Sequence, residues 1–396
     1  MGRRLSTLKE QDSADRPAIL FVYDGAGEPS FAARYIFWVA VEVGFRCFAV
    51  EQRDLHIAGR ETAVRAGVEI LGPHRARALG ESERIEPRVI MHRMPAYRPC
   101  EIRRCEAVMA RLERANPEAL ISFRPYWREM GTKWGAELCF RAGERANVHV
   151  PRPTTYLVAK EEIRERLGQV GAARPLIFKP SDSGQSRGIL VSTPDTFDAV
   201  AEAASRSDWG DYVVQHLAEA PLLYRGKKFD LRLYLLVTSF RPLRYRLYRE
   251  GIVKFAAESY DPAAPADLLR IVAGQSFRKR QGLAMEAISI SELLAELGRE
   301  GYRVADFWDR LEALVGDVLA CLASYPPLAQ AGDLGRHFYL GGLDLIMTRR
   351  ADEFDFVFLE TNHQPMLFGH PYRVFQPSWW IHRQWLSDLL RLCRAS

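Results

Sequence analysis

The chain alternates between apolar runs of strand length and segments whose apolar residues recur at helical spacing. An apolar strand at residues 18–23 leads through a Gly-rich turn into a helix at 31–43, and a second strand follows at 46–51. Further apolar runs at 88–93 and 119–123 are predicted as strands. A strand, a helix and another strand in this order are typical of a parallel α/β sheet. We therefore expect an N-terminal α/β domain.

The pattern changes near Pro151, where strands become short and a polar loop rich in glycine and serine appears at 181–188. The expected strands lie at 175–180, 189–191, 211–215, 231–238 and 243–249, and the expected helices at about 159–167 and 194–206. The segment 261–284 is rich in alanine and proline and then basic, and it is expected to be a loop or a mobile segment, whereas 291–324 is predicted to be largely helical.

These patterns divide the chain into three parts. Residues 1–16 are polar and are expected to be disordered, and residues 17–150 form the predicted N-terminal α/β domain. Residues 151–396 are predicted to form a second domain.

Two apolar strands near the C-terminus, at 340–347 and 354–362, are joined by a short polar turn and predict a β-hairpin. Asp344 lies inside the first strand, and Glu360 and Asn362 end the second. The acidic groups could simply face water. However, Asp344 and Glu360 have apolar neighbours on both sides, and a buried carboxylate is costly unless something pairs with it. Three hard oxygen ligands on paired strands are a natural site for Mg²⁺.

The composition places the chain among ordinary globular proteins. At 396 residues, with 47% hydrophobic and 27% charged residues, it is long enough for two or three domains. The net charge of +5 is mild and the basic residues are dispersed, which argues against nucleic acid as the main partner. The sequence shows neither a signal peptide nor a stretch long enough to span a membrane, so we expect no membrane association and a cytoplasmic location.

Lysine is rare among the basic residues, so each retained lysine is a mild indication of function. Lys179 ends an apolar strand just before the Gly/Ser loop that contains Arg187, and such a loop can bind phosphate through its backbone N–H groups. A surface turn with a flanking lysine is an equally simple explanation.

Gln215 and Leu217 end another strand, where a polar residue beside apolar ones suits an adenine base, although packing on a helix explains them as well.

Three charged residues alternate with apolar ones in the next strand. Lys228, Asp230 and Arg232 therefore share one face, and the intervening apolar residues face the core. They could form a solvated ladder of ion pairs, or they could bind phosphates while the carboxylate orients the two cations. Arg249 ends the following strand and is expected beside the same face.

The chain resembles tubulin-tyrosine-ligase-like ATP-grasp ligases in a series of short motifs and in their order. These motifs lie at 179–180, 213–215, 228–232, 248–251, Asp344 and 360–362. The resemblance covers about residues 175–370. It implies an ATP-grasp fold over residues 151–396, with two lobes at about 151–218 and 219–396, preceded by a Rossmann-like pre-ATP-grasp α/β domain. It implies ATP binding by Lys179, Arg187, Gln215, Leu217, Lys228 and Asp230, catalysis by Lys228, Arg232 and Arg249, and Mg²⁺ binding, with two ions expected, by Asp344, Glu360 and Asn362.

The chain departs from the family pattern at three places, of which the first concerns phosphate binding and the other two concern the substrate. Arg187 stands where the family has a second lysine, which keeps the charge but changes its geometry. The family's Leu-Thr-Asn motif, expected within 260–285, is missing, and the loop after Asn362, including His363, diverges. Tubulin is therefore not implied.

The resemblance predicts a carboxylate–amine ligase that forms an amide through an acyl phosphate and releases ADP and phosphate. Its substrates would be amino-acid, peptide or small-molecule carboxylates and amines. One alternative is a ligase specific for small molecules or natural products, and another is a nucleotide-binding pseudoenzyme or scaffold. An intact set of Asp344, Glu360 and Asn362 argues against the scaffold, and the sequence indicates no oligomeric state.

Overall fold

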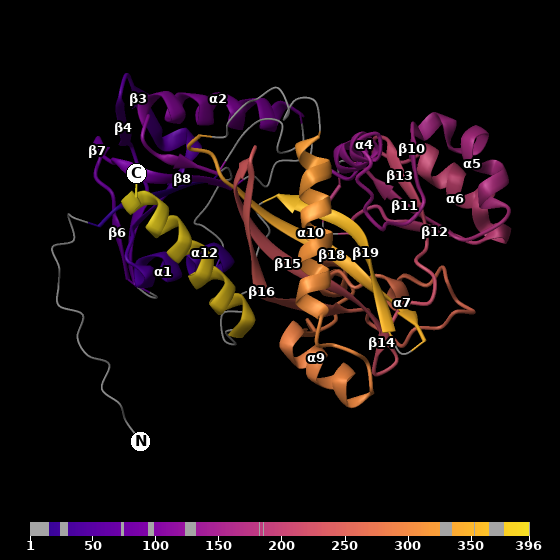
Figure 1. Ribbon diagram of the computed structural model, residues 1–396. Helices are drawn as coiled ribbons and strands as arrows, with labels where there is room; N and C mark the ends of the chain where they lie inside the picture. The colour runs from indigo at the N-terminus through magenta and orange to yellow at the C-terminus, as the bar shows by residue number, and fades with distance from the viewer. Residues whose placement is uncertain are drawn as a thin grey trace. The chain divides into compact units, whose positions relative to one another are not determined.

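The structure is a computed structural model, and it shows a mixed α/β fold with several sheets (Figure 1). It describes residues 16–23, 31–72, 75–93, 99–122, 132–181, 183–184, 186–324, 335–351, 353–363 and 376–395. The expectation of disorder for residues 1–16 lies almost entirely outside the described residues.

The chain divides into two compact units that differ from the expected domains. The first unit comprises Met1–Phe123, Arg336–Phe338 and Met366–Ser396, and the second comprises Arg124–Gly335 and Tyr339–Pro365. The boundary therefore falls before the expected position at 150, because helix α4 (Lys133–Glu144) packs against α10 (Phe307–Ala323) of the second unit. The C-terminal helix α12 (Gln376–Ala395) returns to the first unit, where it packs against α1 (Phe31–Val43).

The first unit is built on a six-stranded sheet in the order β6-β5-β2-β1-β8-β9. Strands β2, β1, β8 and β9 pair in parallel, and β5 and β6 are added in antiparallel fashion. The strands are β1 (Ala18–Tyr23), β2 (Arg46–Glu51), β5 (Val68–Gly72), β6 (Arg75–Ala78), β8 (Pro87–Arg93) and β9 (Leu120–Ile121). Its helices are α1 (Phe31–Val43), α2 (Pro99–Ala115) and α12 (Gln376–Ala395). A separate three-stranded sheet contains β3 (Leu55–Ala58), β4 (Glu61–Val64) and β7 (Glu83–Arg84).

The first strand–helix–strand of this unit is confirmed with the expected bounds, because β1 and β2 are almost continuously apolar and are buried. The strands between 55 and 84 were not anticipated. They are two to five residues long, and β6 is exposed at every position, so they lack the long apolar run that marks a buried strand.

The second unit contains two sheets. The smaller one is antiparallel, in the order β10-β13-β11-β12, and is covered by α5 and α6. Its elements are β10 (Thr155–Val158), β11 (Leu176–Pro180), β12 (Leu190–Ser192), β13 (Tyr212–His216), α5 (Ile163–Gly171) and α6 (Phe197–Ser205). Short 3-10 turns, Lys160–Glu162 and Pro194–Thr196, precede the two helices, and another, Gln52–Asp54, follows β2 in the first unit.

The larger sheet follows the order β17-β16-β15-β18-β19, with β14 also paired to β15. Its strands are β14 (Leu223–Tyr224), β15 (Lys227–Phe240), β16 (Leu243–Phe255), β17 (Ala287–Ser289), β18 (Tyr339–Arg350) and β19 (Glu353–His363). The remaining helices of the unit are α4 (Lys133–Glu144), α7 (Leu268–Ile271), α8 (Gln275–Arg280), α9 (Ile290–Arg299) and α10 (Phe307–Ala323). The predicted hairpin is confirmed as β18 and β19, which pair in antiparallel fashion.

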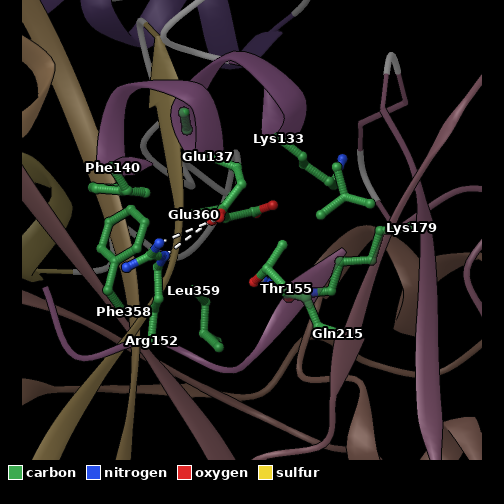
Figure 2. A pocket seen from close by; sticks show the side chains of 12 residues that line it. Lys133, Glu137, Phe140, Arg152, Thr155, Lys179, Gln215, Phe358, Leu359 and Glu360 are labelled. Carbon is green, nitrogen blue, oxygen red and sulfur yellow. Dashed lines mark hydrogen bonds and ion pairs between the residues drawn. The ribbon is translucent and has the colours of Figure 1, made fainter. Parts of the chain in front are cut away.

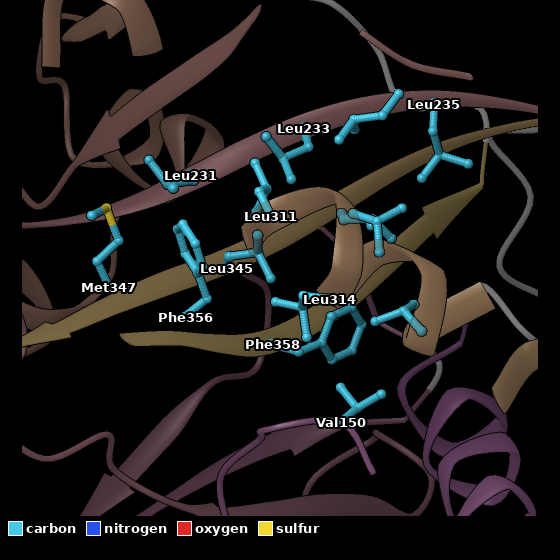
Figure 3. Packing of buried hydrophobic residues seen from close by; sticks show 14 of the residues in the cluster. Val150, Leu231, Leu233, Leu235, Leu311, Leu314, Leu345, Met347, Phe356 and Phe358 are labelled. Atoms are coloured by element: carbon cyan, nitrogen blue, oxygen red, sulfur yellow. The ribbon is translucent and has the colours of Figure 1, made fainter. Parts of the chain in front are cut away.

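One face of this larger sheet forms the main hydrophobic core of the unit. Figure 3 shows Leu231, Leu233 and Leu235 of β15 packing with Leu311 and Leu314 of α10. The predicted alternation along β15 is thereby confirmed, since the odd-numbered residues face α10. The charged residues between them are directed to the opposite face.

The segment 261–284 is not the open loop expected from its sequence. It contains α7 and α8, and Ile271, Val272 and Phe277 form a small core with Val191 of β12. The Arg278 side chain is buried and donates hydrogen bonds to the carbonyls of residues 256 and 284 at 3.0 and 2.9 Å. Short helices of four and six residues carry too few turns to show a periodic pattern in the sequence.

None of the described helices combines the length and the apolar character needed to cross a lipid bilayer.

Gly251 is required where β16 passes β15. A Cβ atom at this position would lie 2.5 Å from the carbonyl oxygen of Arg232 and 2.7 Å from Ile290. We expect Gly251→Ala to lower the free energy of unfolding by about 2 kcal/mol or more, because the strands must separate to admit the methyl group. Gly168→Ala is the matched control, since nothing lies within 4 Å of its Cβ position in α5, and it should be neutral or stabilising. Urea denaturation measures both, and equal effects would contradict the steric account.

Candidate active site

A row of charged side chains crosses three neighbouring strands of the larger sheet. Arg232 on β15 is directly opposite Asp344 on β18, and Asp344 is directly opposite Glu360 on β19. Directly opposed residues of antiparallel strands share a face, so these three side chains lie side by side. Asn362 is opposite Gly342, two positions farther along the same face. The register thus brings the hairpin residues next to the charged strand identified from the sequence.

A β-bulge explains why Glu360 belongs to this row. Phe358 pairs with Leu345 and Glu360 pairs with Asp344, which leaves Leu359 as an extra residue on β19. Phe358 and the alternate residues before it face the α10 core. Without the extra residue Glu360 would continue into that core, and with it the side chain is turned to the opposite face.

Asp344 is buried between two cations. It is 4% exposed, and its Oδ2 accepts hydrogen bonds from Arg232 Nη2 at 2.8 Å and from Lys254 Nζ at 2.9 Å. Arg232 Nε donates to the other carboxylate oxygen. Burial alone would raise the pKa of Asp344, but Arg232 and Lys254 hold that pKa well below its ordinary value. Asp344 is therefore a fixed, ionised carboxylate.

Lys179 lies at the second part of the site, on the smaller sheet. Its Nζ donates a hydrogen bond to Gln215 Oε1 at 2.7 Å, and Gln215 Nε2 donates to Thr155 Oγ1 at 3.0 Å. Burial lowers the pKa of Lys179 to about 8, an effect that the nearby Glu360 carboxylate opposes. Lys179 and Glu360 line the same pocket, so the smaller sheet brings Lys179 close to the charged row.

The remaining charged residues of β15 complete the cluster. Lys228 Nζ donates to Asp230 Oδ1 at 2.6 Å, and both residues influence the pKa of Lys179. The described cluster contains five cations and three carboxylates: Lys133, Lys179, Lys228, Arg232, Lys254, Asp230, Asp344 and Glu360. Its excess of positive charge favours an anionic ligand that carries several charges, such as a polyphosphate.

Figure 2 shows a pocket beside this cluster, lined by residues of α4, β10, β11, β13 and β19. Lys179, Gln215 and Glu360 line it together with Lys133, which also donates a hydrogen bond to the Ser183 carbonyl of the Gly/Ser loop. Lys133 thus connects α4 to the loop expected to bind phosphate.

Another wall of the pocket is an ion-pair network. Arg152 donates two hydrogen bonds to Glu137, at 2.9 and 3.2 Å, and a third to Glu144 at 2.7 Å. Burial would lower the pKa of Arg152, but the two carboxylates raise it above its ordinary value. Arg141 also donates a hydrogen bond to Glu137 at 3.0 Å. The network therefore contains two cations and two carboxylates, and we regard it as a rigid wall of the pocket.

Sequence reasoning missed Lys133 and Lys254. Lys254 carried a usable signal, because it is a lysine within an apolar strand of a chain that contains few lysines. Lys133 lies on a helix upstream of the matched motifs, and only the fold brings it near Lys179.

Three expected site residues lie apart from the charged row. Arg249 is 57% exposed in its side chain and forms ion pairs with Glu312 at 3.0 Å and Asp309 at 3.6 Å, both on α10. The expectation that it lies beside the Lys228–Arg232 face is therefore wrong. The pairing of β15 and β16 shifts between residues 233 and 235, which moves Arg249 out of the register that holds Lys254.

Arg187 is exposed in the Gly/Ser loop, just before Gly188, whose φ is +67°. A Cβ atom at Gly188 would lie 2.3 Å from the Trp209 ring nitrogen, so this turn requires glycine. Leu217 packs against the small core formed with α7 and α8.

The hairpin offers oxygen ligands of the kind that Mg²⁺ prefers. Two carboxylates, Asp344 and Glu360, are neighbours, and Asn362 adds an amide oxygen. The Asn362 Nδ2 atom is buried and has no hydrogen-bond partner among the described residues, so the hydrogen bonds of the protein do not fix this amide. Within the same residues, no group of three or more His, Cys, Asp or Glu side chains could hold a metal ion.

A family model described as "Tubulin-tyrosine ligase family" matches residues 143–373, more than half of the chain. The chain belongs to the tubulin-tyrosine ligase family. Members of this family are ATP-dependent ligases that form carbon–nitrogen bonds.

Several curated relatives are similar to parts of the chain. "Tubulin polyglutamylase TTLL7" of Xenopus tropicalis is 26% identical over 243 residues, which cover 56% of this chain and 25% of that protein. "Probable tubulin polyglutamylase TTLL2" of Homo sapiens is 29% identical over 203 residues, covering 48% of this chain and 31% of that protein. "Tubulin polyglutamylase ttll-4" of Caenorhabditis elegans is 37% identical over 111 residues, covering 27% and 17%. The chain thus spans less than a third of the length of these relatives.

The family resemblance inferred from the motifs is confirmed. The expectation that tubulin is not implied is at odds with the relatives, which are named as tubulin polyglutamylases. The missing motif within 260–285 and the divergent loop after Asn362 were too small a departure to exclude such a substrate.

Proposed function

We propose that the chain is an ATP-dependent carboxylate–amine ligase that forms an amide bond on a protein or peptide. The observation that carries this proposal is the charged row Arg232, Asp344 and Glu360, held within reach of Lys179 on the second sheet. Family membership supplies the reaction class. The names of the relatives favour a protein acceptor and a glutamyl group over a small-molecule acceptor.

The two sheets of the second unit are proposed as the two lobes of an ATP-grasp fold. The parallel strands of the first unit support a Rossmann-like pre-ATP-grasp domain. In this arrangement Lys133, Lys179 and Arg187 bind phosphate oxygens, Gln215 and Leu217 contact the adenine, and Lys228 with Asp230 contacts the ribose and phosphates.

The reaction proceeds in two steps under this proposal. A substrate carboxylate oxygen attacks the γ-phosphorus of ATP, the bond to the β–γ bridging oxygen breaks, and ADP leaves with that electron pair. An amine then attacks the acyl carbon of the acyl phosphate, and phosphate leaves as the amide forms and the amine loses a proton. The lysines and Arg232 orient the phosphates and offset their charge, so positioning and electrostatics supply the rate.

We further propose that Asp344, Glu360 and Asn362 hold Mg²⁺, with two ions in the loaded site. Bound there, Mg²⁺ would neutralise charge on the transferred phosphoryl group.

The test is an ADP-release assay with ATP, glutamate and either tubulin or a synthetic glutamate-rich peptide. We expect ADP release that requires both the amino acid and the acceptor, together with a matching mass increase of the acceptor. A protein that fails to bind ATP, or that releases ADP without modifying any acceptor, would contradict the proposal.

The affinity for ATP should depend on pH through Lys179. Its ammonium is protonated below pH 8 and loses its charge as the pH rises through its pKa of about 8. We expect the dissociation constant for a non-hydrolysable ATP analogue to rise by up to about tenfold between pH 8 and 9. Lys179→Arg stays charged over this range and should show a flatter profile. Fluorescence titration measures both profiles, and identical profiles would show that another group controls the dependence.

A further inference from the structure

Lys254 reaches across a strand to contact Asp344. Its direct partner on β15 is Asp230, yet its Nζ donates to Asp344 Oδ2 at 2.9 Å on the next strand, β18. Adjacent strands lie about 4.8 Å apart, so the long lysine stem is extended over β15 to make this contact. The Lys254 side chain is only 6% exposed, so its ammonium group is buried within the site.

Arg232 and Lys254 hold Asp344 in different ways. Arg232 approaches with two donors, one to each carboxylate oxygen, and therefore fixes the orientation of the carboxylate. Lys254 adds one donor to an oxygen that Arg232 already contacts. Removing Lys254 from Asp344 would thus leave the carboxylate paired, hydrogen-bonded and oriented.

A second carboxylate is available to Lys254. Asp230 lies directly beside it on β15 and accepts a hydrogen bond from Lys228 at 2.6 Å. A carboxylate has about four acceptor positions, so Asp230 can accept a bond from a second ammonium group. A change of side-chain torsions, without movement of the strands, would carry the Lys254 ammonium from Asp344 to Asp230.

We propose that Lys254 is an internal counter-cation that occupies the cation position on Asp344 until Mg²⁺ displaces it toward Asp230. This inference rests on the proposed function, because it takes Asp344 and Glu360 as metal ligands. An ammonium group and a divalent cation on the same carboxylate oxygen repel each other strongly in a buried site. Lys254 is therefore a positioning residue. It balances the negative charge of Asp344 when no metal ion is bound, and it weakens metal binding in the nucleotide-free protein.

The affinity for Mn²⁺, used as a probe for Mg²⁺, tests this competition. Lys254→Met keeps the apolar stem and removes the charge, while Arg232 still pairs with Asp344. We expect nucleotide-free Lys254→Met to bind Mn²⁺ at least about tenfold more tightly than the wild type, because the repulsion is gone. Lys254→Gln, which is neutral but can still donate a hydrogen bond to Asp344, should bind Mn²⁺ more tightly as well and provides a second variant if the first does not fold.

The matched control is Lys227→Met. Lys227 lies on β15 and pairs with Glu286 at 2.7 Å, so the substitution removes one positive charge without touching Asp344. Electron paramagnetic resonance of free Mn²⁺ gives the dissociation constants, and circular dichroism checks the fold. Unchanged affinity in Lys227→Met with tighter binding in both Lys254 variants supports the proposal.

Two results would overturn it, and they are distinguishable. If wild-type binding is lost in Glu360→Gln but Lys254→Met binds no more tightly than the wild type, the metal site stands and the role of Lys254 is wrong. If neither the wild type nor the Lys254 variants bind Mn²⁺, or if Glu360→Gln leaves binding unchanged, the metal site fails and the role of Lys254 fails with it.

Discussion

Glu360→Gln will lower ATP-dependent ligation by on the order of a hundred- to thousandfold, the range seen when one preorganised electrostatic group of an active site is lost. The substitution preserves the size of the side chain but removes the charge opposite Asp344 and near Lys179. The amide is a weaker ligand for a hard cation, and it no longer balances the surplus of positive groups around it. Turnover should therefore fall while the fold is retained.

Glu353→Gln is the matched control for this prediction. Glu353 lies on the same strand, β19, and its carboxylate pairs with the exposed Arg303 at 3.3 Å. It should keep nearly full activity. The activities of the two variants are compared by steady-state ADP release and by the mass increase of the acceptor, at equal thermal stability. Equal activity of the two variants would show that Glu360 does not serve the reaction.

Asp344→Asn will lower the free energy of unfolding by about 3–5 kcal/mol, the largest stability effect that we expect from a single substitution in the site. The change leaves Arg232 and Lys254 buried without the carboxylate that compensates them. Because the pKa of Asp344 lies well below its ordinary value, the stabilising charge is present throughout the neutral range and is lost only at strongly acidic pH. Urea denaturation at neutral pH measures the effect.

A triple variant separates the lost charge from lost packing. Arg232→Met, Lys254→Met and Asp344→Leu together remove all three charges, and this variant should regain most of the stability that Asp344→Asn loses. Asp355→Asn is the surface control, since its partner Arg310 lies at 3.4 Å and both side chains are partly exposed. It should change stability by less than about 1 kcal/mol. A loss in Asp344→Asn no greater than in Asp355→Asn would contradict the buried-pair account.

Continuous apolar strands and alternating patterns were sufficient to predict much of the fold. Strand β1 and helix α1 have the expected bounds, and the alternation along β15 correctly separated its core face from its charged face. Elements without such a pattern were missed. The exposed strand β6 and the short helices α7 and α8 depend on tertiary contacts, and the return of α12 to the first unit has no local signal.

The candidate site shows the same division. The motifs identified Asp344 and Glu360, but their juxtaposition depends on the bulge at Leu359, which alternation alone would not reveal. Arg249 was placed on the wrong side because the register shift between β15 and β16 has no simple sequence signature. Lys254 was overlooked because no local pattern shows that a residue of β16 reaches over β15 to β18.

The most direct test of the central claim follows oxygen from the substrate to phosphate. A glutamate-rich peptide labelled with ¹⁸O in its side-chain carboxylates is used in one reaction, and free glutamate labelled with ¹⁸O in its carboxylates is used in another. In each reaction the ¹⁸O content of the released phosphate is measured by mass spectrometry. A ligase that forms an acyl phosphate must transfer one labelled oxygen to phosphate from whichever substrate is activated, so we predict labelled phosphate in one of the two reactions. Amide formation with unlabelled phosphate in both would contradict the account.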